Sequence, residues 1–239
     1  MSEHTVRAFD RELELLGRKI AEMGGIGEKM LADAIDALIR LDTDLAQATI
    51  AMDKRLDMLQ REVEEAAVLV IARRQPVGVD LREIVAAMRI SGDLERVGDL
   101  AKNIAKRAVK LSQEQRLPRA MIGLRHMGEL AALQLKDVLD AYSQRDVERA
   151  DSVWLRDKEI DALEDSVFRD LDTFMMEDPR NITICAQLLF CSKNVERVGD
   201  HATNIAETVH YILTGEMLPV DRPKGEPRGE PGSEVTGGK

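Results

Sequence analysis

Apolar residues recur in steps of three and four along most of the chain, which is the spacing of one face of an α-helix. The first stretch, residues 1–41, shows this stripe from Phe9 to Ala34 and predicts one long helix. Gly24 and Gly25 interrupt the stripe, and we expect them to bend or loosen this helix. No segment shows sustained alternation of apolar and polar residues, so we expect no β-sheet.

Prolines and capping residues divide the next part of the chain into further predicted helices. A polar break at residues 41–44 offers capping side chains to a second helix, which Pro76 ends. Asp80 is the expected N-cap of the third helix, and Pro118 suits the first turn of the fourth. The five predicted helices span about residues 45–74, 81–112, 119–143, 146–176 and 180–213.

A motif on the third predicted helix occurs again on the last one. Residues 95–105 and 196–206 share nine of eleven positions, beginning with Glu-Arg-Val-Gly-Asp, at an offset of 101 residues. A match of this length indicates an internal duplication. Long helices joined by short loops pack antiparallel. We therefore predict an all-α fold of two tandem antiparallel three-helix bundles, residues 1–114 and 115–215, related by a pseudo-twofold axis.

The composition changes after the second bundle. Residues 216–239 hold four of the seven prolines and five of the sixteen glycines, with almost no apolar residues to bury. Such a segment cannot offset the entropy lost on folding. We predict a disordered tail over residues 216–239.

Charge and composition restrict the class of protein. The net charge of −10 argues against nucleic acid as the main ligand and is compatible with binding metal cations. The longest apolar run is too short to span a bilayer, and the N-terminus lacks the pattern of a secretory signal. Cys185 and Cys191 lie six residues apart on one predicted helix, so we expect reduced thiols and a cytoplasmic protein.

Acidic residues lie four apart on the motif helix and on the helix before it, in both halves. This spacing places them in rows on an accessible face, away from the apolar stripe, and Gly98 has no side chain to crowd the row. Several carboxylates in one patch repel one another unless a cation compensates them. Oxygen ligands suit Mg, Mn or Ca, or iron in an oxygen-rich cluster. The acidic rows are Asp53, Asp57, Glu95 and Asp99 in the first half, and Asp157, Asp161, Glu196 and Asp200 in the second.

Two alternatives remain open for these rows. Acidic residues at this spacing are commonly solvated and paired with Arg or Lys, which would leave a structural helical protein without metal. A di-metal carboxylate enzyme would need ligands inside a bundle core, and Glu207 with His210 matches its Glu-x-x-His spacing without a second copy. We find no phosphate loop, nucleophile–base set or zinc spacing, so we expect no catalysis.

The duplicated motif resembles the signature of the PhoU family, Glu-Arg-x-Gly-Asp-x-x-x-Asn-Ile-Ala. Residues 74–82 also resemble that family's loop into its third helix, and the likeness covers about residues 5–215. The resemblance implies two tandem three-helix bundles and a cytoplasmic negative regulator of the phosphate-starvation response. Such a regulator links the ATPase subunit of the high-affinity phosphate ABC transporter to a membrane sensor histidine kinase.

The resemblance also implies a ligand set. Some members of the family bind multinuclear iron or zinc clusters through acid-x-x-x-Asp pairs; Mg or Mn remains an alternative from ligand chemistry. Asn194 stands where the first repeat has Asp93, so we expect two sites of different charge and affinity. We expect a homodimer that meets the membrane only through its partners. The residues carried over are Glu95, Asp99, Glu196, Asp200, Asp53, Asp57, Asp157 and Asp161, with Asn103 and Asn204 at the motif's third step.

Overall fold

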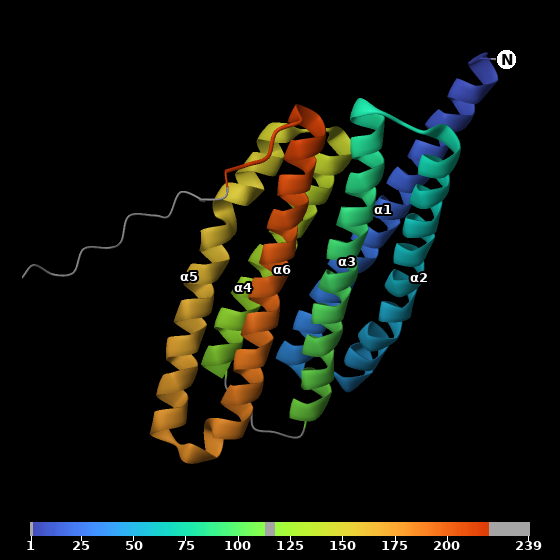
Figure 1. The fold of residues 1–239 in the computed structure, drawn as a ribbon. Coiled ribbons are helices and arrows are strands. Elements are labelled where there is room, and N and C mark those ends of the chain that lie inside the picture. Colours follow the sequence, from blue (N-terminus) through green and yellow to red (C-terminus); the bar gives the residue numbers. More distant parts are fainter. Residues whose placement is uncertain (1, 113–117, 220–239) are drawn as a thin grey trace, which may run out of the picture.

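Six long helices make up the described part of the computed structural model, which comprises residues 2–112 and 118–219 (Figure 1). No strand occurs in these residues, and this confirms the all-α prediction. The helices are α1 (Ser2–Arg40), α2 (Thr43–Arg74), α3 (Gly78–Leu111), α4 (Pro118–Gln144), α5 (Val147–Glu177) and α6 (Ile182–Thr214), with a short 3₁₀ helix η1 (Pro179–Asn181) before α6.

The ends of α2 and α3 show how local chemistry sets the helix boundaries. Asp42, within the predicted polar break at residues 41–44, caps α2, because its Oδ1 accepts hydrogen bonds from the backbone N–H groups of Asp44 and Leu45. The prediction that Asp80 caps α3 is wrong. Gly78 adopts φ +60°, which glycine tolerates, and the helix begins there, so Asp80 lies in its first turn.

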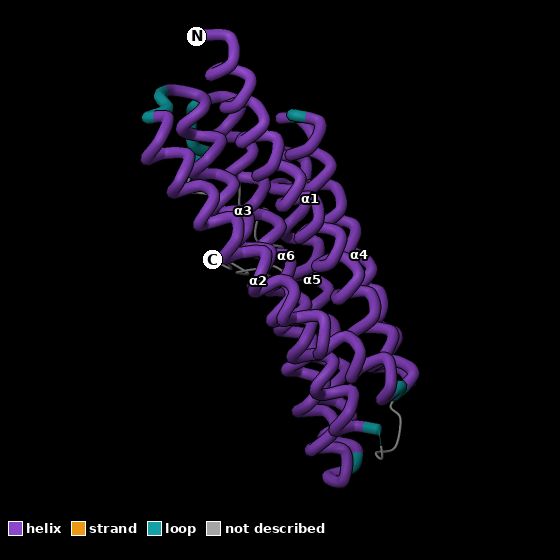
Figure 2. The backbone as a smooth tube through the Cα atoms, turned by 90° about the vertical axis from the view of Figure 1, so that its right-hand side faces the viewer, coloured by secondary structure: helices purple, strands orange, loops and turns teal. Residues whose placement is uncertain are grey.

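The six helices form two groups of three that share one core. The members of each group, α1–α3 and α4–α6, pack on one another, as the tandem-bundle prediction requires. The groups meet where α3 packs on α6 and α1 packs on α4, and α2 and α5 lie at the two outer edges (Figure 1). Seen from the side, the long helices run along one common direction (Figure 2). Buried apolar residues of all six helices form a single continuous cluster. The two repeats therefore bury apolar surface together.

Glycines allow the close approach of α1 and α4. A Cβ on Gly24 would lie 2.8 Å from Leu139 Cδ1, and a Cβ on Gly128 would lie 2.7 Å from Ile35 Cγ1. Leu139 of α4 thus packs over Gly24 of α1, and Ile35 of α1 packs over Gly128 of α4. The helix α1 continues through Gly24 and Gly25 without a break, as the prediction of one long helix requires. The packing of Gly24 explains why an interruption of the apolar stripe lies there.

The remaining sequence predictions concern the cysteines, the membrane and the chain ends. Cys185 and Cys191 are free thiols in the core, and burial raises the pKa of Cys191 to about 12. None of the described helices has the length and hydropathy needed to cross a membrane. Residues 113–117, at the predicted boundary between the bundles, and residues 220–239 of the predicted tail lie outside the described residues. The domain boundaries therefore stay a prediction.

Candidate functional site

The glycine of each duplicated motif brings two helices into close contact. Gly98 and Gly199 are buried. A Cβ on Gly98 would overlap with Leu56 Cδ1, and a Cβ on Gly199 would lie 2.6 Å from Ile160 Cδ1. Gly98 therefore faces the packed side of α3 and does not lie along the acidic row, contrary to the sequence prediction. The close approach of α2 to α3, and of α5 to α6, is what brings the acidic residues of neighbouring helices together.

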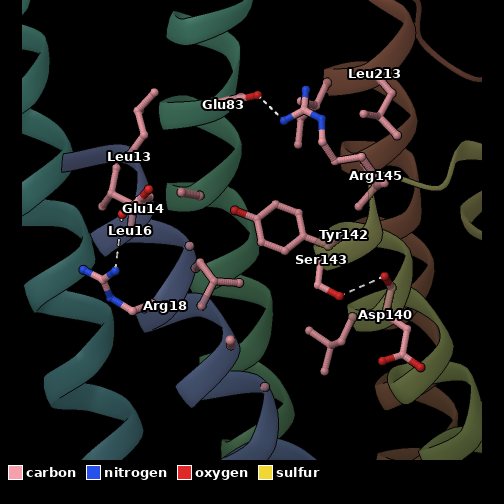
Figure 3. A pocket seen from close by; sticks show the side chains of 18 of the residues that line it. Leu13, Glu14, Leu16, Arg18, Glu83, Asp140, Tyr142, Ser143, Arg145 and Leu213 are labelled. Atoms are coloured by element: carbon pink, nitrogen blue, oxygen red, sulfur yellow. Dashed lines mark hydrogen bonds and ion pairs between the residues drawn. The ribbon is translucent and has the colours of Figure 1, made fainter. Parts of the chain in front are cut away.

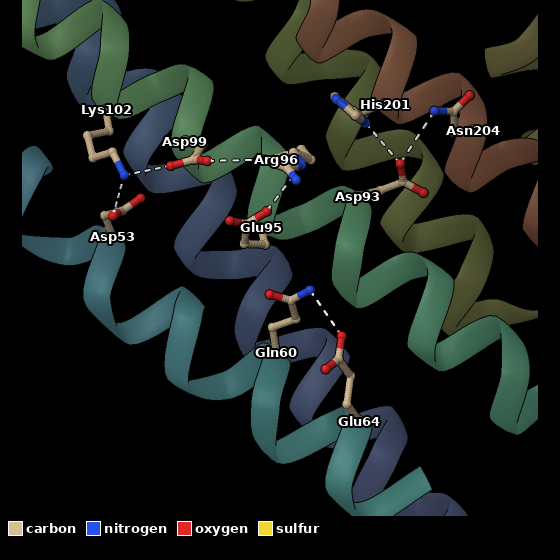
Figure 4. A network of polar contacts seen from close by, with 10 residues as sticks. All are labelled: Asp53, Gln60, Glu64, Asp93, Glu95, Arg96, Asp99, Lys102, His201 and Asn204. Atoms are coloured by element: carbon tan, nitrogen blue, oxygen red, sulfur yellow. Dashed lines mark hydrogen bonds and ion pairs between the residues drawn. The ribbon is translucent and has the colours of Figure 1, made fainter. Parts of the chain in front are cut away.

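In the first repeat a lysine lies between two of these acids (Figure 4). Lys102 Nζ donates to Asp53 Oδ2 of α2 at 2.6 Å and to Asp99 Oδ1 of α3 at 2.5 Å. Glu95 and Asp99 both lie within 3.5 Å of the guanidinium of Arg96, an exposed side chain on the same helix. The structure thus brings Asp53 to the motif helix as expected, with an ammonium group between the two carboxylates.

Burial controls the electrostatics of this group. Asp53 is only 7% exposed, so it does not lie on an accessible face as predicted. Burial raises the pKa of Glu95, and repulsion from Asp99, Asp57 and Asp53 raises it further. Burial alone would lower the pKa of Lys102, but its two carboxylate partners outweigh that effect and raise it to about 12. Lys102 is therefore a permanent cation at neutral pH.

The second repeat has a different arrangement at the equivalent positions. Thr203 replaces Lys102, and its hydroxyl donates to Asp157 Oδ1 at 2.9 Å. Asp157 is 6% exposed, which also corrects the prediction of an accessible face, whereas Asp161 is exposed. Glu196 Oε1 accepts from Lys193 Nζ at 2.6 Å. The other oxygen, Oε2, is buried without a hydrogen-bond partner among the described residues, which leaves a carboxylate oxygen able to accept a ligand.

The two motif asparagines have different surroundings. Asn204 donates to Asp93 Oδ1 at 3.4 Å, and His201 Nδ1 lies 2.9 Å from the same oxygen (Figure 4). These contacts join α6 to α3 across the two repeats. Asn103 lines a shallow cavity between α2 and α3 with residues such as Gln47. The structure therefore places Asn204 in the contact between repeats.

No three His, Cys, Asp or Glu side chains within residues 2–112 and 118–219 are grouped so that they could share a metal ion. The Glu-x-x-His pair also has other contacts. Glu207 accepts from the indole of Trp154 at 3.2 Å, and His210 Nδ1 lies 2.7 Å from Asp151 Oδ1. A di-metal enzyme site of the bundle-core type therefore has no ligand set in this part of the chain.

A large cavity lies elsewhere, where α4 ends against α1, α3 and α6 (Figure 3). Its volume is about 750 Å³, and its walls are mostly apolar, with Leu16, Leu139 and Leu213 among the lining residues. The Tyr142 ring projects into it, and the ion pair of Arg145 with Glu83 lies at its edge. The groove forms only through tertiary packing, because its lining residues come from four helices.

The residue that sequence analysis missed is Lys102. It occupies one of the two positions at which the duplicated eleven-residue segments differ, the other being Leu100 against His201. A comparison of the repeats for differences, and not only for identities, would have singled out Lys102 against Thr203. The contact with Asp53 spans 49 residues of sequence and could not be derived from helical spacing.

The chain is similar to known proteins over nearly its whole length. A family model described as PhoU domain matches residues 20–108 and 124–209, so it covers both copies of the motif. A protein of Rhizobium meliloti (strain 1021), named phosphate-specific transport system accessory protein PhoU homolog, is 53% identical over 224 residues, or 93% of this chain and 94% of its own. A protein of the same name from Caulobacter vibrioides (strain NA1000 / CB15N) is 52% identical over 224 residues, or 94% of this chain and 97% of its own.

Solved structures share the fold as well. The crystal structure of PhoU from Pseudomonas aeruginosa is 39% identical with a TM-score of 0.85, and the match covers 87% of this chain and all of that one, 100%. The structure of the phosphate transport system regulatory protein PhoU from Streptococcus pneumoniae is 28% identical with a TM-score of 0.81, covering 89% and 100% of the two chains. The match confirms the helical architecture.

Proposed function

The chain belongs to the PhoU family, and on this basis we propose that it is an accessory protein of a phosphate transport system that represses the phosphate-starvation response. The observation that carries this proposal is the near-complete coverage of relatives that bear this name, at 52–53% identity. Both copies of the motif, on α3 and α6, fall within the matched family segments. A regulator without catalysis of its own fits a molecule of packed helices whose acids pair with neighbouring side chains.

The proposed route of action is through protein partners in the cytoplasm. We propose that helix surfaces of the molecule contact the ATPase subunit of the phosphate ABC transporter and a sensor histidine kinase, and that the chain acts as a homodimer. The contact with the transporter would be made on the cytoplasmic side, through the ATPase subunit. A pull-down from cells grown at high phosphate should capture both partners. Capture of neither would count against this route.

Gene deletion tests the regulatory role directly. Removal of the gene should leave alkaline phosphatase expressed at high phosphate, and a plasmid copy of the wild-type chain should restore repression. The exposed-residue variant Glu159→Gln should complement as well as wild type, which controls for expression of a substituted chain. Unchanged repression in the deletion strain would refute the proposal.

A metal ion is the second part of the proposal. A multinuclear iron or zinc cluster needs ligands shared among several ions, and the described side chains do not bring three candidate ligands together. Hydrated Mg²⁺ or Mn²⁺ requires only one or two carboxylates beside its waters. The second repeat fits such an ion best, because Glu196 Oε2 is buried and lacks a partner among the described residues. We propose that Glu196 would hold it there through this oxygen, where the ion would supply charge compensation.

A further inference from the structure

The face of α1 that packs on α4 continues past the end of α4. Leu139 of α4 packs over Gly24 of α1, and the contact at Gly128 has the same register. Two antiparallel helices in this register bring Gln144, the end of α4, beside about residue 19 of α1. Within the described residues neither α5 nor α6 packs on α1. The earlier turns of α1 therefore lack a helix on this side, and the groove of Figure 3 lies in that place.

Small side chains keep the α1 wall of this groove open. Gly24, Ala21 and Gly17 follow one another in steps of three and four, so they share the face of α1 that meets α4. A Cβ on Gly17 would meet nothing within 4 Å, whereas a Cβ on Gly24 meets α4. Tyr142 of α4 and Leu213 near the end of α6 lie on the opposite side. A groove of about 750 Å³ between these walls has room for side chains of one more helix along α1.

The rim of the groove is acidic. Five acidic residues and two arginines line it, which gives a formal net charge of −3. These residues are Asp10, Glu14, Glu28, Glu83 and Asp140, with Arg18 and Arg145. Asp10 and Glu28 make no ion pair with a described residue, although Lys136 attracts Glu28 at longer range. Burial raises the pKa of Glu28, and a cation placed beside it would offset that cost.

A polar group also projects into the groove. The Tyr142 ring points into it, and the hydroxyl makes no hydrogen bond with a described residue (Figure 3). Burial, together with repulsion from Glu83, raises the pKa of Tyr142 to about 12. The hydroxyl therefore stays protonated at neutral pH and can donate to an occupant, as the hydroxyl of a largely buried tyrosine usually does.

We infer, on the premise of the proposed function that the chain acts through protein partners, that this groove binds a basic amphipathic helix of a partner protein. The occupant is a helix because the groove continues the line of α4 along α1. Its apolar side chains, three and four residues apart, fill the space beside Gly17 and Ala21. Its flanks carry Lys or Arg, which complement the acidic rim at Asp10 and Glu28.

A synthetic helix tests the chemistry of the occupant. The probe is an amphipathic peptide of about 16 residues with leucine along one stripe and lysine on both flanks, and fluorescence anisotropy measures its binding to the full-length protein. Wild type should bind one peptide per chain, with an affinity that falls as salt rises. The same peptide with glutamate in place of lysine should not bind. Equal binding of the two peptides would overturn the inference.

Filling the groove tests the location. Gly17→Leu places a side chain in the open space, so it should weaken binding of the lysine peptide by about tenfold or more. Gly92→Leu on α3 is the matched control, because its Cβ also meets nothing within 4 Å and Gly92 does not line the groove. Gly25→Leu is the second variant if Gly17→Leu fails to fold, and circular dichroism checks the helix content of each. Equal affinities of the Gly17→Leu and Gly92→Leu chains would refute the assignment.

Neutralising the rim tests the role of charge. Asp10→Asn combined with Glu28→Gln should weaken binding of the lysine peptide by about threefold and reduce its salt dependence. Glu159→Gln, on the exposed face of α5, should leave the affinity unchanged. An unchanged affinity of the double variant would show that charge does not select the occupant, which contradicts the inference.

Further measurements separate the inference from its premise and from another occupant. If wild type self-associates in light scattering and Gly17→Leu abolishes this, a second copy of the chain fills the groove and the inference is wrong. In the deletion strain at high phosphate, Gly17→Leu should leave alkaline phosphatase expressed, whereas Gly92→Leu should restore repression. If Gly17→Leu loses the peptide but restores repression, the regulatory role stands and the partner site is wrong. If the deletion strain stays repressed, the proposed function fails, and the peptide measurements alone decide the inference.

Discussion

At the scale of single residues, identical positions in the two repeats do not have identical environments. Gly98 and Gly199 serve the same purpose, because each receives an aliphatic side chain of the neighbouring helix. Asn103 and Asn204 do not serve the same purpose, since Asn204 contacts Asp93 of the other repeat. Lys102 and Thr203 differ in charge itself. The duplicated motif therefore conserves a way of packing two helices, while the polar contacts around it are individual.

Substituting alanine for each of two glycines of α3 separates the effect of packing on stability from the effect of helix propensity. Gly98→Ala forces Leu56 to move, whereas a Cβ at Gly92 meets nothing within 4 Å. Both substitutions gain the same propensity, so their difference isolates overpacking. We expect Gly98→Ala to be less stable than Gly92→Ala by about 1–3 kcal/mol in urea denaturation. Equal stabilities would show that Leu56 repacks without cost.

At the scale of helices, charged side chains add specific links to the apolar core. Asp137 of α4 accepts hydrogen bonds from Arg149 at 2.9 Å and from Arg156 at 2.5 Å, both on α5. Burial would raise the pKa of Asp137, but the two arginines outweigh that effect and lower the pKa below its usual 3.8. The ionised form is thus favoured in the folded state. This link stabilises the α4–α5 pair above the ordinary pKa of an aspartate and is lost as the pH falls through the lowered value.

Asp137→Asn should therefore destabilise the protein in a pH-dependent way. At pH 7 the cost should be about 1.5–3 kcal/mol, the range for hydrogen bonds to charged groups. The difference from wild type should shrink as the pH falls below about 4, because Asp137 of the unfolded chain then becomes protonated, and it should vanish once the pH has passed the lowered pKa of the folded state. Chemical denaturation of both proteins at pH 7 and pH 3 measures this difference in the free energy of unfolding. Glu159→Gln on the exposed face of α5 should show no such loss at pH 7, and a pH-independent cost at Asp137 would contradict the charge-based explanation.

At the scale of the whole molecule, the two repeats behave as one unit because they share a core. α3 packs on α6, and α1 packs on α4 through the reciprocal glycine contacts of Gly24 and Gly128. The buried apolar cluster is continuous across both groups of helices. One continuous core favours a single cooperative unfolding transition, although the sequence consists of two similar halves.

Leucine at Gly24 should uncouple the repeats, since its side chain would occupy the space of Leu139. We expect calorimetry to show one transition for wild type and two, with the first at a lower temperature, for Gly24→Leu. Gly25→Leu is the matched control, because a Cβ at Gly25 meets nothing within 4 Å. It should keep the single transition. Two transitions in wild type would mean that the contact between repeats contributes little.

The sequence by itself determined the features that depend on local order. The three-to-four spacing of apolar residues, the polar break at residues 41–44 and the prolines at the junctions predicted six helices to within a few residues of their ends, because helix formation and capping involve residues a few positions apart. The repeated motif showed the duplication and the family for the same reason, as a string of neighbouring residues.

Only the tertiary structure decided the features that depend on how helices turn toward one another. Asp53 and Asp157 are buried, although their spacing placed them on an accessible face, because the glycines of the neighbouring motif draw α2 onto α3 and α5 onto α6. The partner of Asp53 is Lys102, 49 residues away, and helical periodicity cannot assign such a contact. Rotation and crossing of long helices are set by side-chain packing over the whole core, so charge compensation at the acidic rows became visible only in three dimensions.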